Sequence, residues 1–313
     1  MSNAVWTVIL IMGFFLAALL PAMGVVFVIA SVIAGIMLCY RTNAMWVAVE
    51  YFGCMICVAM VSGDFLSAGM LMISCMVPCL LIVVAFRRQF EYKITMAMGT
   101  GGFLLGYLCQ FFVYQLLHGQ NMYAVMLQND REAIADAVVT ALSASGTMSG
   151  GVESANVMVN QLFEMILLCI PAVLMIISAM LAGFAIWAAA AFLKKEGFSV
   201  VTIPIARFYA AKGWGLVYIL TIILSLGDDA ISGFGLNIFI LLSAYFCVCG
   251  FAVIDFYMKK RFTKVYLRCM IYIPAFLILS SGMLFVSPVL ILIFAGILDM
   301  IFDFRKLRLK KIS

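Results

Sequence analysis

Apolar blocks of about 20 residues or more, long enough to cross a bilayer as helices, recur along this chain from one end to the other. Hydrophobic residues make up 67% of the sequence and charged residues 11%. Soluble domains have about 45–50% apolar and about 25% charged residues, so this excess cannot be the core of a water-soluble fold. Strand-like alternation is missing, and a helix satisfies its own backbone hydrogen bonds in lipid. The sequence therefore predicts an all-α, polytopic transmembrane helical bundle embedded in the lipid bilayer.

The apolar blocks predict about ten spans, two pairs of which are short and lie at the ends of the chain. They cover residues 4–20, 22–39, 44–62, 66–86, 95–117, 160–193, 213–227, 232–258, 269–282 and 285–303. If 1–39 or 269–303 forms a re-entrant or bent unit, about eight crossings remain. We expect an N-terminal bundle over 1–193, with an outer amphipathic segment at 119–159. C-terminal helices with basic loops and a basic tail are expected to follow over 194–313.

Lysine and arginine residues predict the orientation, because they are enriched in cytoplasmic loops. They gather at Arg41, 87–93, 194–212, 259–268 and 305–311. The polar stretch 119–159 has several acids and a single basic residue, Arg131. We therefore expect a multi-pass protein of the cell (inner or plasma) membrane, with both termini cytoplasmic and 119–159 outside. Attraction to anionic lipid, about 1 kcal/mol per basic residue, explains the tail without a nucleic-acid partner.

The tryptophans agree with this orientation. All four lie within a turn or two of predicted cytoplasmic helix ends, where an aromatic belt would place them: Trp6, Trp46, Trp187 and Trp214.

Cysteine and histidine give no sign of a metal site or of catalysis. Cys54 and Cys57 form a CxxC pair, but it lies in an apolar run with no second pair and no nearby histidine, so packing thiols are favoured. The single histidine, His118, and Ser149 invite comparison with an intramembrane serine protease, yet the serine lies in a hydrophilic loop. No phosphate loop or HExxH motif is present. We expect no enzyme activity, no metal and no cofactor.

Acidic and amide side chains in or beside the spans are the candidate solute-binding residues, because an unpaired charge in the bilayer is costly. Glu50 lies six residues into the third span, about 9 Å from its start at 1.5 Å per residue. Asn160, Gln161 and Glu164 begin the sixth span on the predicted outer side. The structural alternatives stay open: Glu50 hydrogen-bonded between helices, and Glu164 solvated at the interface.

Two aspartates near the C-terminus, Asp299 and Asp303, are four residues apart and would repel each other on one helix face. We hypothesise that Asp299 meets a basic residue of the loop 259–268 and that Asp303 pairs with Lys306. Asp255 precedes Lys259 by four residues, the favourable helical order for a local ion pair.

The C-terminal third contains the most specific sequence pattern. The stretch "GLNIFILLSAYFCVCGFAVIDFYMKKR" includes Asn237, Tyr245 and Gly250, and the ending "GILDMIFDFRKL" includes Gly296, Asp299, Asp303 and Arg305. Together these stretches resemble the YybS-like family of bacterial membrane proteins, a domain of unknown function common in Firmicutes, with a layout that covers nearly the whole chain. Cys249 departs from that family, which tends to have Gln before the Gly.

The N-terminal spans are similar, more remotely, to the substrate-capturing S subunits of energy-coupling-factor vitamin transporters. Those proteins often have AxxxA on the first span, and this chain has Ala18 with Ala22 and Ala30 with Ala34. Small residues at this spacing suit close helix contact. The resemblance implies an S-subunit-like fold for the N-terminal part of the chain.

We therefore expect a small-solute-binding or transport-related membrane subunit without its own ATPase. Its cavity would open outward beneath an amphipathic helix at 121–144 and would be lined from the third, fifth and sixth spans. The alternative is a membrane scaffold or assembly factor that binds a membrane protein partner through helix faces and basic loops.

Overall fold

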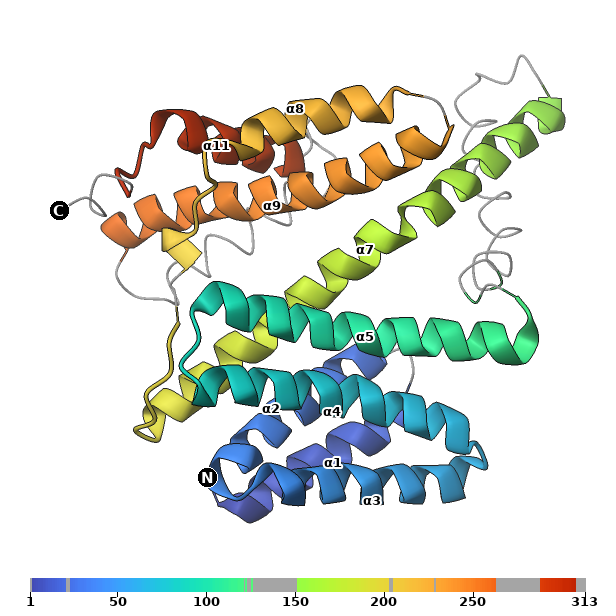
Figure 1. The fold of residues 1–313 in the computed structure, drawn as a ribbon, viewed down its shortest axis with the longest axis vertical. Coiled ribbons are helices and arrows are strands. Elements are labelled where there is room, and N and C mark those ends of the chain that lie inside the picture. The colour runs from blue at the N-terminus through green and yellow to red at the C-terminus, as the bar shows by residue number, and fades with distance from the viewer. Residues whose placement is uncertain are drawn as a thin grey trace. The chain divides into compact units, whose positions relative to one another are not determined.

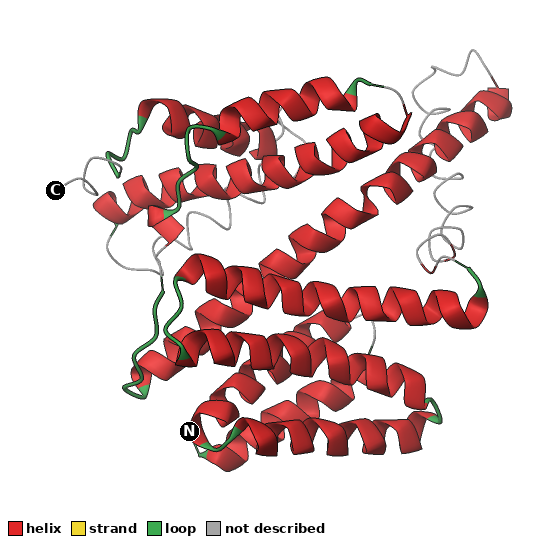
Figure 2. Ribbon diagram, in the orientation of Figure 1, coloured by secondary structure: helices red, strands yellow, loops and turns green. Residues whose placement is uncertain are grey.

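The computed structural model describes residues 2–20, 23–120, 122, 125, 151–202, 205–227, 229–262 and 288–307. Over these residues the chain is helical and has no strand, which confirms the all-α prediction (Figures 1 and 2). The predicted span 269–282 and nearly all of the predicted outer helix 121–144 lie outside the described residues.

Within the described ranges, six helices have the length and hydropathy to cross a bilayer, as a multi-pass membrane protein requires. They are α2 (Gly24–Arg41), α3 (Ala44–Ser62), α4 (Phe65–Arg87), α5 (Tyr92–His118), α7 (Gly151–Lys195) and α9 (Asp229–Arg261). Shorter apolar helices are α1 (Asn3–Leu19), α8 (Trp214–Ser225) and α11 (Pro288–Phe302), and a 3-10 turn, η2, covers Ile205–Arg207.

The chain divides into two compact units. Unit 1 comprises Met1–Ile170 and Leu174–Thr202, and unit 2 comprises Pro171–Val173 and Ile203–Ser313. Each unit has its own buried apolar cluster, around Leu10, Tyr51 and Ile186 in unit 1 and around Phe246 and Ile293 in unit 2.

In unit 1, helices α1 to α5 follow one another in antiparallel order through short connections, and α3, α4 and α5 lie side by side (Figure 1). A polar relay in the core joins the first three helices. The Tyr51 hydroxyl donates to Ser31 O at 2.9 Å, and the Ser31 hydroxyl donates to Leu10 O at 3.3 Å. Because lipid supplies no competing hydrogen-bond partners, this relay holds α1, α2 and α3 together from inside.

Basic side chains meet at one end of unit 1, which we call the basic end. Arg41, at the end of α2, forms an ion pair with Glu196 and donates to Asn3 Oδ1 at 3.2 Å. Arg87, at the end of α4, donates to Cys39 O at 2.5 Å. These contacts join the end of α2 to the start of α1, to the residue after α7 and to the end of α4. The orientation rule predicts that this end faces the cytoplasm.

Tryptophan burial departs from the aromatic-belt expectation at one position. Trp46 is 67% exposed and Trp187 is 63% exposed, as residues at a membrane interface would be. Trp6 is only 3% exposed, and its ring lies edge-on to Phe192 with centroids 5.3 Å apart. Trp6 lies near the start of α1 as predicted, but its ring packs between helices and does not face lipid.

The opposite end of unit 1 has a sharp connection between α3 and α4. Gly63, with φ 70°, ends α3 in the left-handed conformation that glycine favours. Asp64 then caps α4 by accepting hydrogen bonds from the N–H groups of Leu66 and Ser67. The Ser67 hydroxyl and these N–H donors lower the pKa of the Asp64 carboxyl, since they stabilise its charged form.

In unit 2, helices α9 and α11 meet backbone to backbone at two glycines. A Cβ atom at Gly250 would overlap Leu292 O, and one at Gly296 would overlap Phe246 O. Close approach of this kind requires the absence of a side chain. Two residues of the family-like motifs therefore have a packing role here.

We predict that Gly250→Ala and Gly296→Ala each lower the melting temperature of the protein in mild detergent. The added methyl group must push two helices apart, at a cost of about 1–3 kcal/mol. Gly53→Ala and Gly101→Ala are matched controls, because both lie within helices and a Cβ there meets nothing within 4 Å. Equal melting of all four variants, measured by scanning fluorimetry, would contradict the glycine contact.

Candidate pocket and polar clusters

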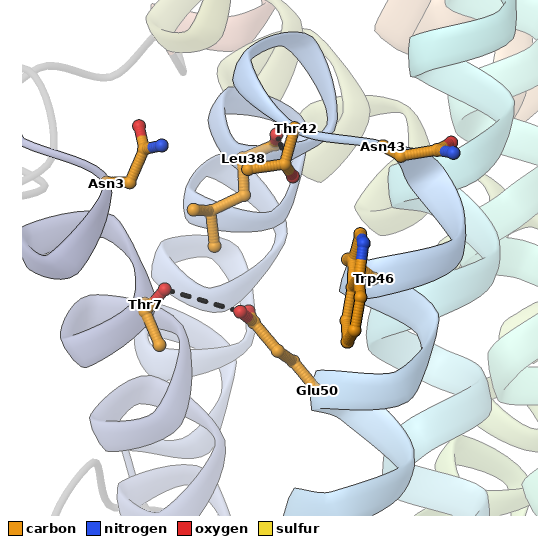
Figure 3. Close-up of a pocket in the computed structure, with 7 residues that line it drawn as sticks. All are labelled: Asn3, Thr7, Leu38, Thr42, Asn43, Trp46 and Glu50. Carbon is orange, nitrogen blue, oxygen red and sulfur yellow. Dashed lines mark hydrogen bonds between the residues drawn. The ribbon is translucent and has the colours of Figure 1, made fainter.

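Helix α3 directs Trp46 and Glu50 toward α1 and the end of α2. The two residues are four positions apart, so they lie one helical turn from each other on the same face. Figure 3 shows the Glu50 carboxylate reaching from α3 toward Thr7 of α1, with the Trp46 indole beside it.

These side chains border an open pocket of about 550 Å³ at the basic end of unit 1. Its lining comes from α1, from the end of α2, and from α3 and the residue before it: Asn3, Thr7, Leu38, Thr42, Asn43, Trp46 and Glu50 (Figure 3). Most of these residues are polar, and the volume is in the range of about 300–1,000 Å³ typical of small-molecule sites. The arrangement can hold a small polar molecule.

Glu50 is the only acid in this lining, and its carboxylate is incompletely paired. The Thr7 hydroxyl donates to Oε1 at 3.4 Å, whereas the buried Oε2 has no hydrogen-bond partner. Over the part of the chain that the structure describes, no ion pair reaches Glu50. Arg41, the basic residue that contacts the lining residue Asn3, forms its ion pair with Glu196. An ionised Glu50 therefore keeps an unbalanced negative charge.

The other three predicted solute-binding residues lie elsewhere. Asn160, Gln161 and Glu164 are on α7, are exposed, and do not line this pocket. Glu50 thus shares its pocket with residues of the first two helices and not with the sixth predicted span. The expected outer cavity beneath 121–144 concerns residues that the structure does not describe, and it stays a prediction.

Sequence reasoning missed the remaining pocket residues. Trp46 could have been found from its spacing of four residues to Glu50, because that spacing places both on one helix face. Asn3 and Thr7 have the same spacing on α1. Nothing in the sequence, however, indicated that this face of α1 lies opposite Glu50.

The C-terminal acids form a second polar cluster, in unit 2. Asp299 is 3% exposed, and its Oδ2 accepts hydrogen bonds from Arg305 Nη2 at 2.7 Å and Nε at 3.1 Å. Arg305 also donates to Ala206 O at 2.8 Å and to Phe208 O at 2.6 Å. The guanidinium therefore joins the end of α11 to the chain around η2.

This geometry corrects the hypothesis about the acid pair. The partner of Asp299 is Arg305 and not a residue of 259–268. Asp303 accepts from the Leu307 N–H at 3.2 Å, and its pairing with Lys306 stays a prediction. Asp303 has φ 47°, a left-handed conformation that Asp tolerates, so the chain turns back after α11 and returns Arg305 to Asp299. The predicted pair of Asp255 with Lys259 is confirmed at 2.7 Å.

Asn237 and Tyr245 also form structural hydrogen bonds in unit 2. Asn237 Oδ1 accepts from the Ala172 N–H at 3.0 Å, next to Pro171, and Tyr245 donates to Tyr209 O at 3.3 Å. A proline inside a helix disturbs the local hydrogen-bond ladder, so an amide side chain that accepts from the following N–H satisfies a backbone group in an apolar setting.

We predict that Asp299→Asn lowers the melting temperature strongly, because it leaves the buried Arg305 guanidinium without a counter-charge. Removing one partner of a buried pair costs about 3–5 kcal/mol. Asp64→Asn is the matched control, since Asp64 is exposed and Asn caps a helix N-terminus as well as Asp does. If the two variants melt at the same temperature in detergent, the buried pair does not stabilise the C-terminal end.

Comparison with known proteins identifies a family without adding a function. The model of a family described as "Predicted membrane protein (DUF2232)" matches residues 6–300, a range that includes Glu50, Trp46 and the α9–α11 glycines. No curated protein and no solved structure matches the chain.

Proposed function

The chain belongs to the DUF2232 family of predicted membrane proteins, and from that premise we propose that it is a small-solute-binding, transport-related membrane subunit. It has no ATPase of its own, because its sequence lacks a phosphate-binding loop. The solute binds in the pocket at Glu50. In this proposal the family includes the YybS-like proteins that the C-terminal motifs resemble, and unit 1 has an S-subunit-like bundle.

One observation supports the proposal above others: Glu50 is an incompletely paired acid, inside a helix long enough to span the membrane, on the wall of a pocket. An ionised side chain at the centre of a span costs about 2.5–3.5 kcal/mol. Other described residues also have a buried polar atom without a partner, namely Trp6, Tyr40, Ser178 and Asp299, but none of them lines this pocket. An acid that keeps an unpaired oxygen beside a cavity is a binding group by default.

The position of the pocket indicates the side of the membrane from which the solute would enter. The pocket lies at the basic end of unit 1, next to Arg41, and the positive-inside rule assigns that end to the cytoplasm. We therefore propose that both termini are cytoplasmic and that the solute enters from the cytoplasmic face, and not through the outward-opening cavity expected from the sequence. Transport would need an energised partner protein, which the chain would contact within the membrane.

The test is native mass spectrometry of the full chain, released in mild detergent from its own membrane. We predict a reproducible small-molecule adduct on the wild-type protein that is lost in Glu50→Gln. Glu164→Gln is the matched control, because Glu164 is an exposed acid outside the pocket, and it should keep the adduct. Melting temperatures of the variants show that the loss does not reflect unfolding.

Two outcomes would overturn the proposal in different ways. Loss of the adduct in Glu164→Gln alone would move the site to α7. A chain that carries no small molecule and instead retains another membrane protein would favour the scaffold function.

A further inference from the structure

We infer that the ligand of the pocket is an organic cation, a primary amine or a quaternary ammonium, held between the Glu50 carboxylate and the face of the Trp46 indole. This inference rests on the proposed function, since it names the class of solute that the pocket binds.

The pocket lining pairs an acid with an aromatic ring. Trp46 and Glu50 lie one turn apart on α3, and both line the pocket (Figure 3). The Trp46 side chain is 67% exposed, so a ligand can reach its ring. Tryptophan is the aromatic residue that attracts cations best, and aromatic faces are a common recognition element for quaternary ammonium groups. The Glu50 carboxylate, one helical turn away, supplies the counter-charge.

The lining of the pocket has a net negative charge when Glu50 is ionised. It contains one acid and no basic residue. Arg41, which lies close enough to donate to Asn3, also binds the carboxylate of Glu196. An anionic ligand would therefore meet the Glu50 charge without compensation. A neutral ligand could donate a hydrogen bond to the unpartnered Glu50 Oε2, but it would leave the negative charge of the carboxylate unbalanced. A cation is the class of ligand that balances the site.

The neutral residues of the lining limit the size and polarity of the ligand. Thr7 offers a hydroxyl beside the carboxylate, Thr42 and Asn43 add polar groups elsewhere in the lining, and Leu38 offers an apolar wall. The Thr42 hydroxyl already donates to Leu38 O at 2.8 Å, so it is available to a ligand as an acceptor. A cation with a short polar or alkyl substituent satisfies these groups.

The ammonium group can come from two sources. Glu50 lies about 9 Å from the start of its helix, at 1.5 Å per residue, so either a free amine or the amine headgroup of a phospholipid could reach it. Both ligands carry an ammonium group. Measurements in membranes with and without an amine-headgroup lipid tell the two sources apart.

The experiment measures binding to the full chain by calorimetry, in nanodiscs of phosphatidylglycerol alone and in nanodiscs that also contain phosphatidylethanolamine. The probes are choline, ethanolamine and the neutral isostere of choline, in which carbon replaces the ammonium nitrogen. We expect at least one of the two cations to bind and the isostere to bind at least about tenfold more weakly, because charge-assisted contacts are lost. If the headgroup is the ligand, phosphatidylethanolamine will weaken binding of the free amines and remain bound in native mass spectra.

Variants assign the binding to the two side chains. Glu50→Gln should weaken binding of the cation by about tenfold or more. Trp46→Leu should weaken it by about two- to fivefold, and Trp46→Phe should bind with an affinity between those of Trp46→Leu and the wild type. Glu91→Gln and Trp187→Leu are matched controls, since both residues are exposed and lie outside the lining, and they should bind as wild type does.

Failure of this inference can be told from failure of the proposed function. If the native adduct depends on Glu50 but proves neutral or anionic, or if the isostere binds as tightly as choline, the cation inference is wrong and the binding function stands. If neither choline nor ethanolamine binds and no Glu50-dependent adduct exists, both are wrong.

Discussion

The absence of water in the bilayer core is the constraint on which the whole structure depends, because each polar group there needs a partner within the protein. Several side chains meet this need by bonding to backbone carbonyl groups of another helix or loop. Within the spans, Tyr51 bonds to Ser31 O and Ser31 to Leu10 O; at helix ends, Arg87 bonds to Cys39 O and Arg305 to Ala206 O and Phe208 O. Polar residues thus join neighbouring segments in both units. Five described residues depart from this pattern with one unpartnered polar atom each, and of these Glu50 lies beside a pocket.

The fold class and several helix bounds could be predicted because both depend on local sequence. The third predicted span, 44–62, coincides with α3 (Ala44–Ser62), and the fourth, 66–86, is one residue shorter at each end than α4 (Phe65–Arg87). The partner of Asp299 could not be predicted by the same reasoning. Helical spacing assumes that the helix continues, whereas the left-handed conformation of Asp303 reverses the chain and brings Arg305 back.

The candidate site was predictable only in part, for a related reason. An acid within an apolar block can be recognised in any sequence, and Glu50 was found in this way. The residues opposite it belong to α1 and to the end of α2, and periodicity does not state which helices are neighbours. Asn160, Gln161 and Glu164 were chosen as polar residues at the start of the sixth span, and neither polarity nor place in a span gives their distance from Glu50.

Two basic residues at the basic end of unit 1, Arg41 and Arg87, bind other groups and leave the Glu50 carboxylate in the pocket without a counter-charge. Arg41 binds Glu196 and Asn3, and Arg87 binds Cys39 O and lies 5.9 Å from the centre of the Tyr40 ring. Both guanidinium groups are thus occupied in holding the helix ends together. They give the end of the bundle its positive charge, yet neither forms an ion pair with Glu50. A free lysine or arginine here would compete with a cationic ligand, and the internal pairing of Arg41 and Arg87 removes that competition.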